Sequence, residues 1–121
     1  MDYPLTKNMY KDKRGTINDL AVGNDWSVTY ITFKKGAVRG NHYHKETIQH
    51  DIVLKGSLLC KKGHETGFPK KGDLIHIEAN IPHAYEALED SEIVSICFGK
   101  RIGDNYYKDT YVLQEPLIAS K

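Results

Sequence analysis

The chain has 121 residues, with 17 basic and 16 acidic side chains and a formal charge of +1. This length suffices for one domain that folds without disulfides or a structural metal. The even charge balance, with no block of either sign, argues against a nucleic-acid or membrane surface, so we expect a small-molecule ligand and a second copy of the chain as partners.

Residues 1–15 and the two cysteines indicate a cytoplasmic protein. The N-terminal stretch lacks the apolar core of a signal peptide, and no apolar run approaches the length of a membrane span. Cys60 and Cys97 lie far apart and form no C-x-x-C pattern. We therefore expect both to be small buried side chains in a reducing compartment.

Strands and turns follow one another along the chain, with no convincing helix. Residues 26–36 are rich in aromatic and β-branched residues and end in a glycine. Residues 48–63 predict two strands that meet near Gly56, residues 71–83 predict a strand that ends in a proline turn, and residues 92–100 predict another strand. Turn residues that recur at roughly eight to twelve positions are typical of an all-β sandwich or barrel.

The first fifteen residues and the tail after Gly103 show no clear strand pattern. The tail nevertheless contains Tyr106, Tyr107 and Tyr111. Aromatic side chains at this density favour packing, including packing against a second subunit, over disorder.

The stretch "RGNHYHKETIQHD" begins at Arg39 and contains three of the six histidines. His42 and His44 are one residue apart, so on an extended chain both point to the same face. Gln49 begins the next apolar run and can bring an amide oxygen to that face, while His83 follows a turn that contains a proline. Three imidazoles and an amide oxygen suit one divalent transition metal, Zn, Fe, Mn, Ni or Co, with open positions for a substrate.

Four further residues near this cluster are considered for a role in the site. Asp51 lies two residues after Gln49, on the same strand face, which makes it a candidate acid or base; a bulged or reversed strand would instead make it a surface charge. Arg39 can bind a phosphate or carboxylate, although an arginine beside a glycine turn is commonly only solvated. Tyr85 can line a sugar pocket, whereas Tyr43 should face away from the histidines on either side of it.

The remaining histidines are expected to serve the structure. His50 lies on the strand face opposite Gln49 and should pack within a sheet or a subunit contact. His64 lies in a polar hairpin and should be exposed. We expect a structural role for His76, which alternates with Leu74 along its strand.

The spacing of these residues resembles the two motifs of the cupin superfamily. The first motif is matched by Gly36, His42, His44, Gln49 and Gly56, with glutamine at the position where the family usually has glutamate. The second motif is matched by "GDLIHIEANIPHAYEA", residues 72–87, in which His83 is the motif histidine. Three positions depart from the second motif, namely Glu78 for proline, Asn80 for glycine and Ala87 for the closing asparagine.

This resemblance implies a single cupin domain over residues 1–121, with its core at about residues 26–100. The implied fold is an all-β double-stranded β-helix, or jelly-roll barrel, with the site in its open interior. We expect the chain to form a homodimer.

Finer features resemble cupins that act on carbohydrates. "RGNHYHK" followed by Gln49, together with Asp12, Arg14 and Gly15 in "KDKRG", resembles the sugar-nucleotide cupins of polysaccharide biosynthesis. The three histidines and the glutamine are similar to the metal ligands of small cupins that linearise unsaturated uronates. Both similarities imply isomerisation or epimerisation by removal of a proton next to a carbonyl.

His42 and His44 can serve this chemistry in two ways. In a metal-free site either imidazole can act as the base, since imidazole titrates near neutrality. With a metal bound, both become ligands instead. Because glutamine adds no negative charge, such a site keeps the full charge of a divalent ion, which favours anionic substrates.

Two other function classes fit the same motifs, because fold does not fix function. One is a metal-dependent dioxygenase or lyase that acts on another small oxygenated acid. The other is a cupin that binds a small molecule without catalysis.

Overall fold

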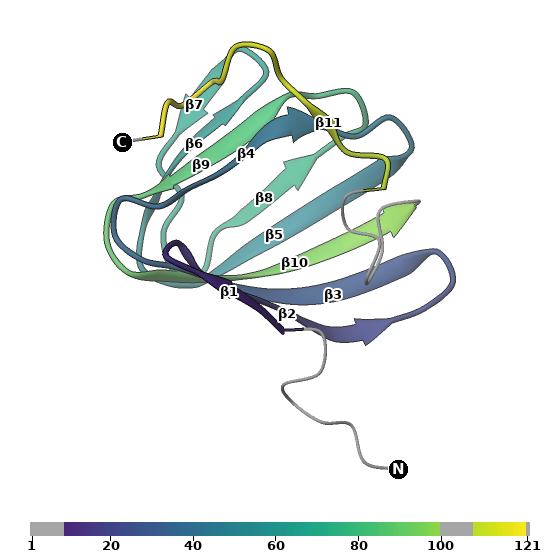
Figure 1. Cartoon of the computed structure of the whole chain (residues 1–121), viewed down its shortest axis with the longest axis horizontal. Helices are drawn as coiled ribbons and strands as arrows, with labels where there is room; N and C mark the ends of the chain where they lie inside the picture. The colour runs from purple at the N-terminus through teal and green to yellow at the C-terminus, as the bar shows by residue number, and fades with distance from the viewer. Residues whose placement is uncertain (1–8, 100–107, 121) are drawn as a thin grey trace.

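The computed structural model describes residues 9–99 and 108–120, in which eleven strands form two antiparallel sheets without any helix. The larger sheet has the order β1-β2-β3-β10-β5-β8 and the smaller the order β11-β4-β9-β6-β7. Figure 1 shows the sheets as two facing layers, which confirms the predicted all-β, two-sheet architecture. The strands are β1 (Met9–Asp12), β2 (Gly15–Val22), β3 (Trp26–Phe33), β4 (Val38–Tyr43), β5 (Thr47–Lys55), β6 (Leu58–Lys62), β7 (Glu65–Gly67), β8 (Leu74–Ile77), β9 (His83–Ala87), β10 (Ser91–Gly99) and β11 (Tyr111–Val112).

The core lies between the two sheets, because alternate side chains of each strand point inward. Cys60 and Cys97 are both buried, as predicted. Phe33 and Tyr85 meet edge to face across the core, with ring centroids 6.2 Å apart. The main cluster consists of Ile31, Phe33, Ala37, Val53, Leu58, Cys60, Ile75, Ile77, Tyr85, Ala87 and Ile93.

The connection from β4 to β5 passes from the smaller sheet to the larger one. β4 pairs with β9 in the smaller sheet, which sets His42 directly opposite His83. β5 lies in the larger sheet and brings Gln49 and Asp51 from the other side. The two motifs therefore meet in the space between the layers.

Strand β1 lies within the first fifteen residues, where the sequence showed no pattern. Its hairpin with β2 depends on Gly15, which has a φ of 132°. A Cβ atom at Gly15 would lie 2.2 Å from the carbonyl oxygen of Thr32, so the turn packs against β3 only because this residue has no side chain. Strand β1 has too few apolar residues to show a strand pattern in the sequence, and its pairing with β2 stabilises it instead.

The described part of the tail packs on the barrel. β11 pairs with β4, and the ring of Tyr111 stacks on that of Tyr43 at a centroid distance of 5.3 Å. Tyr106 and Tyr107 lie outside the described residues. Within the described residues, no helix has the length and apolarity needed to cross a bilayer.

Candidate metal centre

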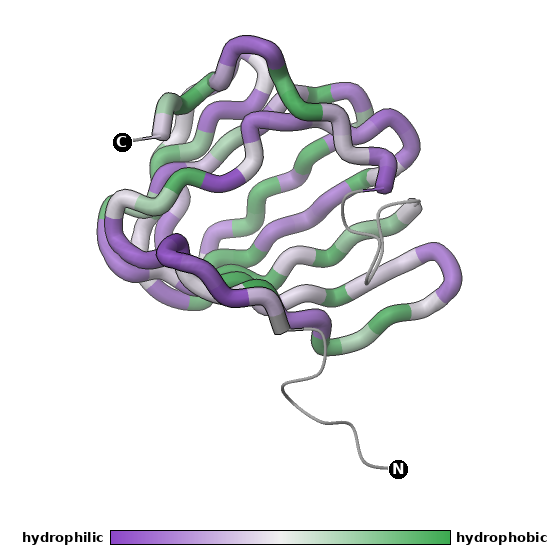
Figure 2. Tube along the Cα trace, viewed as in Figure 1, coloured by the Kyte–Doolittle hydropathy of each residue, from purple (hydrophilic) through white to green (hydrophobic). Residues whose placement is uncertain are grey.

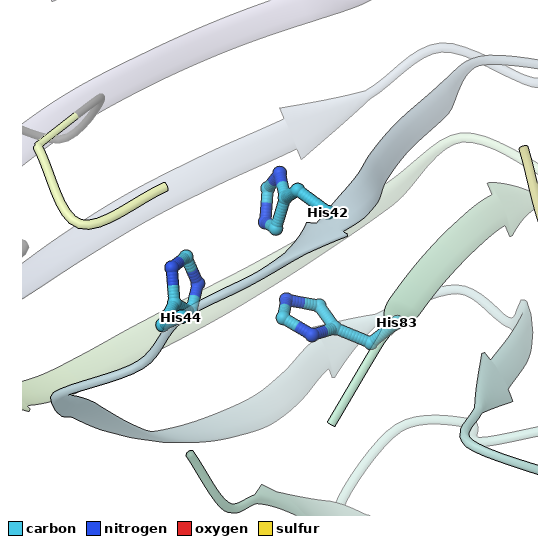
Figure 3. Close-up of side chains that lie close together, drawn as sticks. All are labelled: His42, His44 and His83. Atoms are coloured by element: carbon cyan, nitrogen blue, oxygen red, sulfur yellow. The ribbon is translucent and has the colours of Figure 1, made fainter. Parts of the chain in front are cut away.

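His42, His44 and His83 converge between the two sheets. Their side chains point toward one another (Figure 3), and one ring nitrogen from each histidine lies within 4.8 Å of one from each of the other two. The ring centroids are 4.9, 4.7 and 5.2 Å apart. His44 and His83 are buried and His42 is half-buried. The structure thus brings together the three histidines that the spacing singled out.

An irregularity in β4 directs His42 into this cluster. The register of β4 on β9 shifts between Gly40 and His42, and Asn41 between them has a φ of 59°. The side chain of Asn41 is held by the C-terminal segment, since its Oδ1 accepts from the backbone amides of Leu117 and Ile118 at 2.8 and 3.1 Å. Bulges of this kind commonly redirect a side chain beside a functional site.

Backbone carbonyls set the orientation of two of the imidazoles. His44 Nδ1 lies 3.0 Å from the carbonyl oxygen of Asp109, and His83 Nδ1 lies 2.9 Å from that of Ile81. Because a carbonyl can only accept, a proton on Nδ1 satisfies each of these two contacts by donating to the carbonyl. A neutral ring then presents the lone pair of Nε2, which is the arrangement typical of metal-binding histidines.

The amide of Gln49 is oriented by Asp51. Its Nε2 donates to both carboxylate oxygens of Asp51, at 3.0 and 2.8 Å. Since a carboxylate offers only acceptors, this pairing fixes which end of the amide faces which neighbour. Oε1 therefore points to His44 Nε2, 3.2 Å away.

A cation would satisfy the contact between Gln49 Oε1 and His44 Nε2 when His44 carries its proton on Nδ1. Both atoms present lone pairs when His44 is neutral and donates through Nδ1. Either a second proton on His44 or a metal ion bound by both atoms satisfies them. With His42 and His83, these atoms form a set of three nitrogens and one oxygen that fits a divalent first-row metal.

Asp51 is completely buried, so the structure does not place it as a surface charge. Besides Gln49, it accepts a hydrogen bond of 2.5 Å from the hydroxyl of Tyr85. Burial raises the pKa of Tyr85 well above its ordinary value of 10.0, and the negative charge of Asp51 raises it further. Tyr85 therefore stays protonated, and its hydroxyl donates a hydrogen bond to Asp51.

A cavity of about 240 Å³ opens beside the histidine cluster. Ile17, Ile31, Phe33 and Ile93 give it an apolar wall. Asp51 and His44 are not in its lining, but Asp51 contacts the lining residues Gln49 and Tyr85, and His44 contacts Gln49. The other lining residues are Tyr10, Arg14, Arg39, Gly40, His42, Gln49, His83, Tyr85 and Thr110.

Two arginines line this cavity. Arg39 is buried rather than solvated; its guanidinium lies over the ring of Phe33, 5.4 Å from the centroid, and donates to the Thr32 carbonyl. Arg14 extends from the β1–β2 turn, and Asp12 accepts hydrogen bonds of 2.9 and 2.7 Å from it. The positive charge of Arg39 gives the cavity a preference for an anion.

The C-terminal segment supports the centre in a way that motif spacing did not reveal. The carboxylate of Asp109 accepts from the backbone amides of Lys45 and Glu46, at 3.1 and 2.8 Å, and from the hydroxyl of Thr47 at 2.8 Å. The same residue provides the carbonyl that orients His44. No local pattern could have found Asp109, because it lies 65 residues after His44.

The other residues from the sequence analysis lie away from the centre. His50 is on the opposite side of β5 and meets His76, with their Nδ1 atoms 3.1 Å apart. His64 is exposed in a turn, as expected. Tyr43 stacks on Tyr111 and is not part of the cavity lining, also as expected.

Replacing Asp109 with alanine should weaken metal binding. The variant keeps the backbone carbonyl of residue 109 that contacts His44, but it loses the three side-chain hydrogen bonds that hold this carbonyl in position. We therefore expect the metal dissociation constant to rise about 10- to 100-fold. Competition with a chromogenic chelator measures this constant. Glu115→Ala, an exposed position in the same segment, is the control; equal affinity in both variants would contradict the supporting role of Asp109.

Acid should remove the stabilisation that Asp12 provides. Its hydrogen bonds with Arg14 lower the pKa of Asp12 from 3.8 to about 2. A carboxyl group whose pKa is lowered by folding stabilises the folded state when the pH is above its pKa in the unfolded chain. This contribution is lost as the pH falls from about 4 to about 2. The difference in unfolding free energy between wild type and Asp12→Asn should therefore shrink over that window in denaturant titrations. Asp25→Asn controls for loss of an exposed charge, and a difference that persists at pH 2 would refute the assignment.

Comparison with solved structures places this fold among known proteins. KdgF from Halomonas sp. is similar with a TM-score of 0.69 and 23% identity, over 77% of this chain and 86% of that one. The capsular polysaccharide assembling protein CapF from Staphylococcus aureus has a TM-score of 0.72 and 25% identity, over 94% of this chain and 34% of its own. A single-residue variant of oxalate decarboxylase from Bacillus subtilis has a TM-score of 0.77 and 21% identity, over 92% of this chain and 32% of its own.

This chain thus spans about a third of CapF and of oxalate decarboxylase, and most of KdgF. No curated protein matches the chain. Residues 29–99, more than half of the sequence, match the family described as the cupin domain. With its two facing sheets and its histidines at the motif positions, the chain belongs to the cupin family.

Proposed function

We propose that this cupin is a metal-dependent enzyme that isomerises or epimerises an anionic carbohydrate, a uronate or a nucleotide sugar. The observation that carries the proposal is the orientation of Gln49 by Asp51, which turns an amide oxygen toward the histidine cluster. This donor set lies at a cavity that Arg39 also lines.

His42, His44, Gln49 and His83 would hold the metal. A divalent ion bound there supplies a Lewis acid that stabilises negative charge developing on a substrate oxygen. The chain contributes the orientation of its ligands, through the backbone carbonyls at Asp109 and Ile81 and the carboxylate of Asp51.

The dimensions and charge of the cavity support an anionic sugar. A volume of about 240 Å³ suits a uronate, or the sugar ring of a nucleotide sugar whose nucleotide lies outside the cavity. The flat rings of Phe33 and Tyr85 and the aliphatic wall offer apolar contacts, and the guanidinium of Arg39 can bind a carboxylate or phosphate. Similarity to the capsular polysaccharide assembling protein CapF agrees with a carbohydrate substrate.

Tyr85 and Asp51 would move the proton. Of these two, Tyr85 lines the cavity, and its hydroxyl already donates to Asp51. In the proposed step, the proton next to the substrate carbonyl passes to the Tyr85 oxygen while the Tyr85 proton passes to Asp51. Tyr85 stays neutral, in keeping with its raised pKa, and Asp51 gains the proton.

Metal analysis should find about one divalent transition metal per chain in protein purified without chelator. His44→Ala should lose it, whereas Gln49→Glu should retain it because a carboxylate adds charge to the site. Unsaturated uronates and nucleotide sugars, tested separately, should raise the melting temperature of the metal-loaded protein and be converted.

The same experiment separates the alternatives. Turnover by wild type that carries no metal would refute the role of a metal in the reaction. His42 or His44 would then be the base that removes the substrate proton. Oxygen consumption with a small acid would instead identify a dioxygenase, and ligand recovered unchanged would identify a binding protein.

Asp51→Asn and Tyr85→Phe should each slow exchange of the substrate proton with deuterated solvent by about 10²- to 10⁴-fold, since each breaks the proton path. Nuclear magnetic resonance follows the exchange, and metal content measured in parallel shows whether the ligands remain in place. Tyr43→Phe, whose ring lies outside the cavity, is the matched control. Exchange at the wild-type rate in metal-loaded Asp51→Asn would exclude this path.

A further inference from the structure

The outer face of the larger sheet is apolar, although an antiparallel sheet normally turns a polar face to water. Figure 2 shows hydrophobic residues recurring along β10 and β5. On β10 the inward positions include the small or polar residues Ser91, Ser95 and Cys97. The outward apolar residues, termed the outer face below, are Trp26, Val28 and Tyr30 of β3, Val94, Ile96 and Phe98 of β10, Ile48, Ile52 and Leu54 of β5, and Leu74 of β8.

These residues form one continuous patch, because their strands are neighbours. In one row Trp26 is paired with Phe98, which is paired with Ile48. In another row the register joins Tyr30 to Val94, then Ile52 and then Leu74. The patch therefore runs across four strands.

The exposed area is large for a single chain. Five residues of the outer face are between 41 and 61% exposed. They present roughly 500 Å², at about 200 Å² for a fully exposed large side chain. With the half-buried residues added, the area approaches the roughly 800 Å² per partner of a standard stable interface. The five are Trp26, Ile48, Leu54, Leu74 and Phe98.

Polar groups within and beside the outer face already bind one another. Glu92 interacts with the hydroxyl of Tyr30, and burial together with this hydrogen bond raises the pKa of Tyr30 to about 12. His50 and His76 share a contact between their Nδ1 atoms at 3.1 Å. Because these groups are partnered within the face, covering it leaves few polar atoms without hydrogen bonds.

We infer that the outer face is the interface between two copies of this chain, packed sheet against sheet. Glu92 is the one charged residue among the outward positions of the described strands β3 and β10, so two such faces meet with little charge repulsion. A flat sheet face lined with β-branched and aromatic side chains is the natural complement of another such face. The inference does not depend on the proposed function, since the outer face lies on the opposite side of β5 from Gln49 and Asp51.

Val94→Glu tests this interface, because it places a charge in the middle of the patch. Sedimentation velocity should show wild type as a dimer at micromolar concentration and the variant as a monomer, with its dissociation constant raised about 100-fold or more. Phe68→Glu, at a residue 66% exposed outside the outer face, is the matched control and should remain dimeric. Leu74→Glu, at an exposed position on the patch, provides a second disruptive variant if Val94→Glu does not fold.

Trp26 is the single tryptophan of the chain and lies in the outer face, so it offers an independent measurement. When wild type is diluted from above to below its dimer dissociation constant, acrylamide should quench the fluorescence of Trp26 more strongly. Leu74→Glu should show this stronger quenching at every concentration. Three results would overturn the inference: a wild-type monomer, a Val94→Glu dimer as tight as wild type, or a dimer whose Trp26 is quenched as readily as in the monomer.

Discussion

The direction of one side-chain amide governs the chemistry of this site. Gln49 lies between a carboxylate that can only accept hydrogen bonds and a cluster of imidazoles. Because the NH₂ group must face Asp51, the carbonyl oxygen must face His44. If Asp51 were absent, the amide could rotate and present hydrogen-bond donors to the histidines, which would repel a cation.

Asp51 therefore holds two neighbouring side chains from one buried position. Its oxygens fix the orientation of Gln49 toward the histidines and accept a hydrogen bond from Tyr85. A carboxylate without solvent contact is costly unless it is fully hydrogen-bonded, and here the neighbours Gln49 and Tyr85 supply those bonds. A substitution of Gln49, Asp51 or Tyr85 should therefore alter the position of the other two side chains.

The sequence predicted the parts of this structure that depend on local order. Composition and turn residues predicted the strands β3, β5, β6, β8 and β10, and alternation predicted that His42 and His44 share a face. The resemblance of the two motifs to the cupin family implied the jelly-roll fold and the place of His83 in the site. The strand β1, the burial of Arg39 and the contacts of Asp109 were not predictable in this way. Each depends on segments that meet only after folding, such as the close approach of Gly15 to Thr32.

The support that Asp109 gives to His44 has a consequence for the order of events during synthesis. Asp109 follows His44 by 65 residues, and its carboxylate organises the loop from Lys45 to Thr47. A nascent chain that has emerged only through His83 already contains every proposed ligand, yet it lacks the carbonyl that turns the His44 ring. The ribosome must therefore add the C-terminal segment before the histidine cluster can take its final shape, so uptake of the proposed metal should follow translation of the barrel rather than guide it.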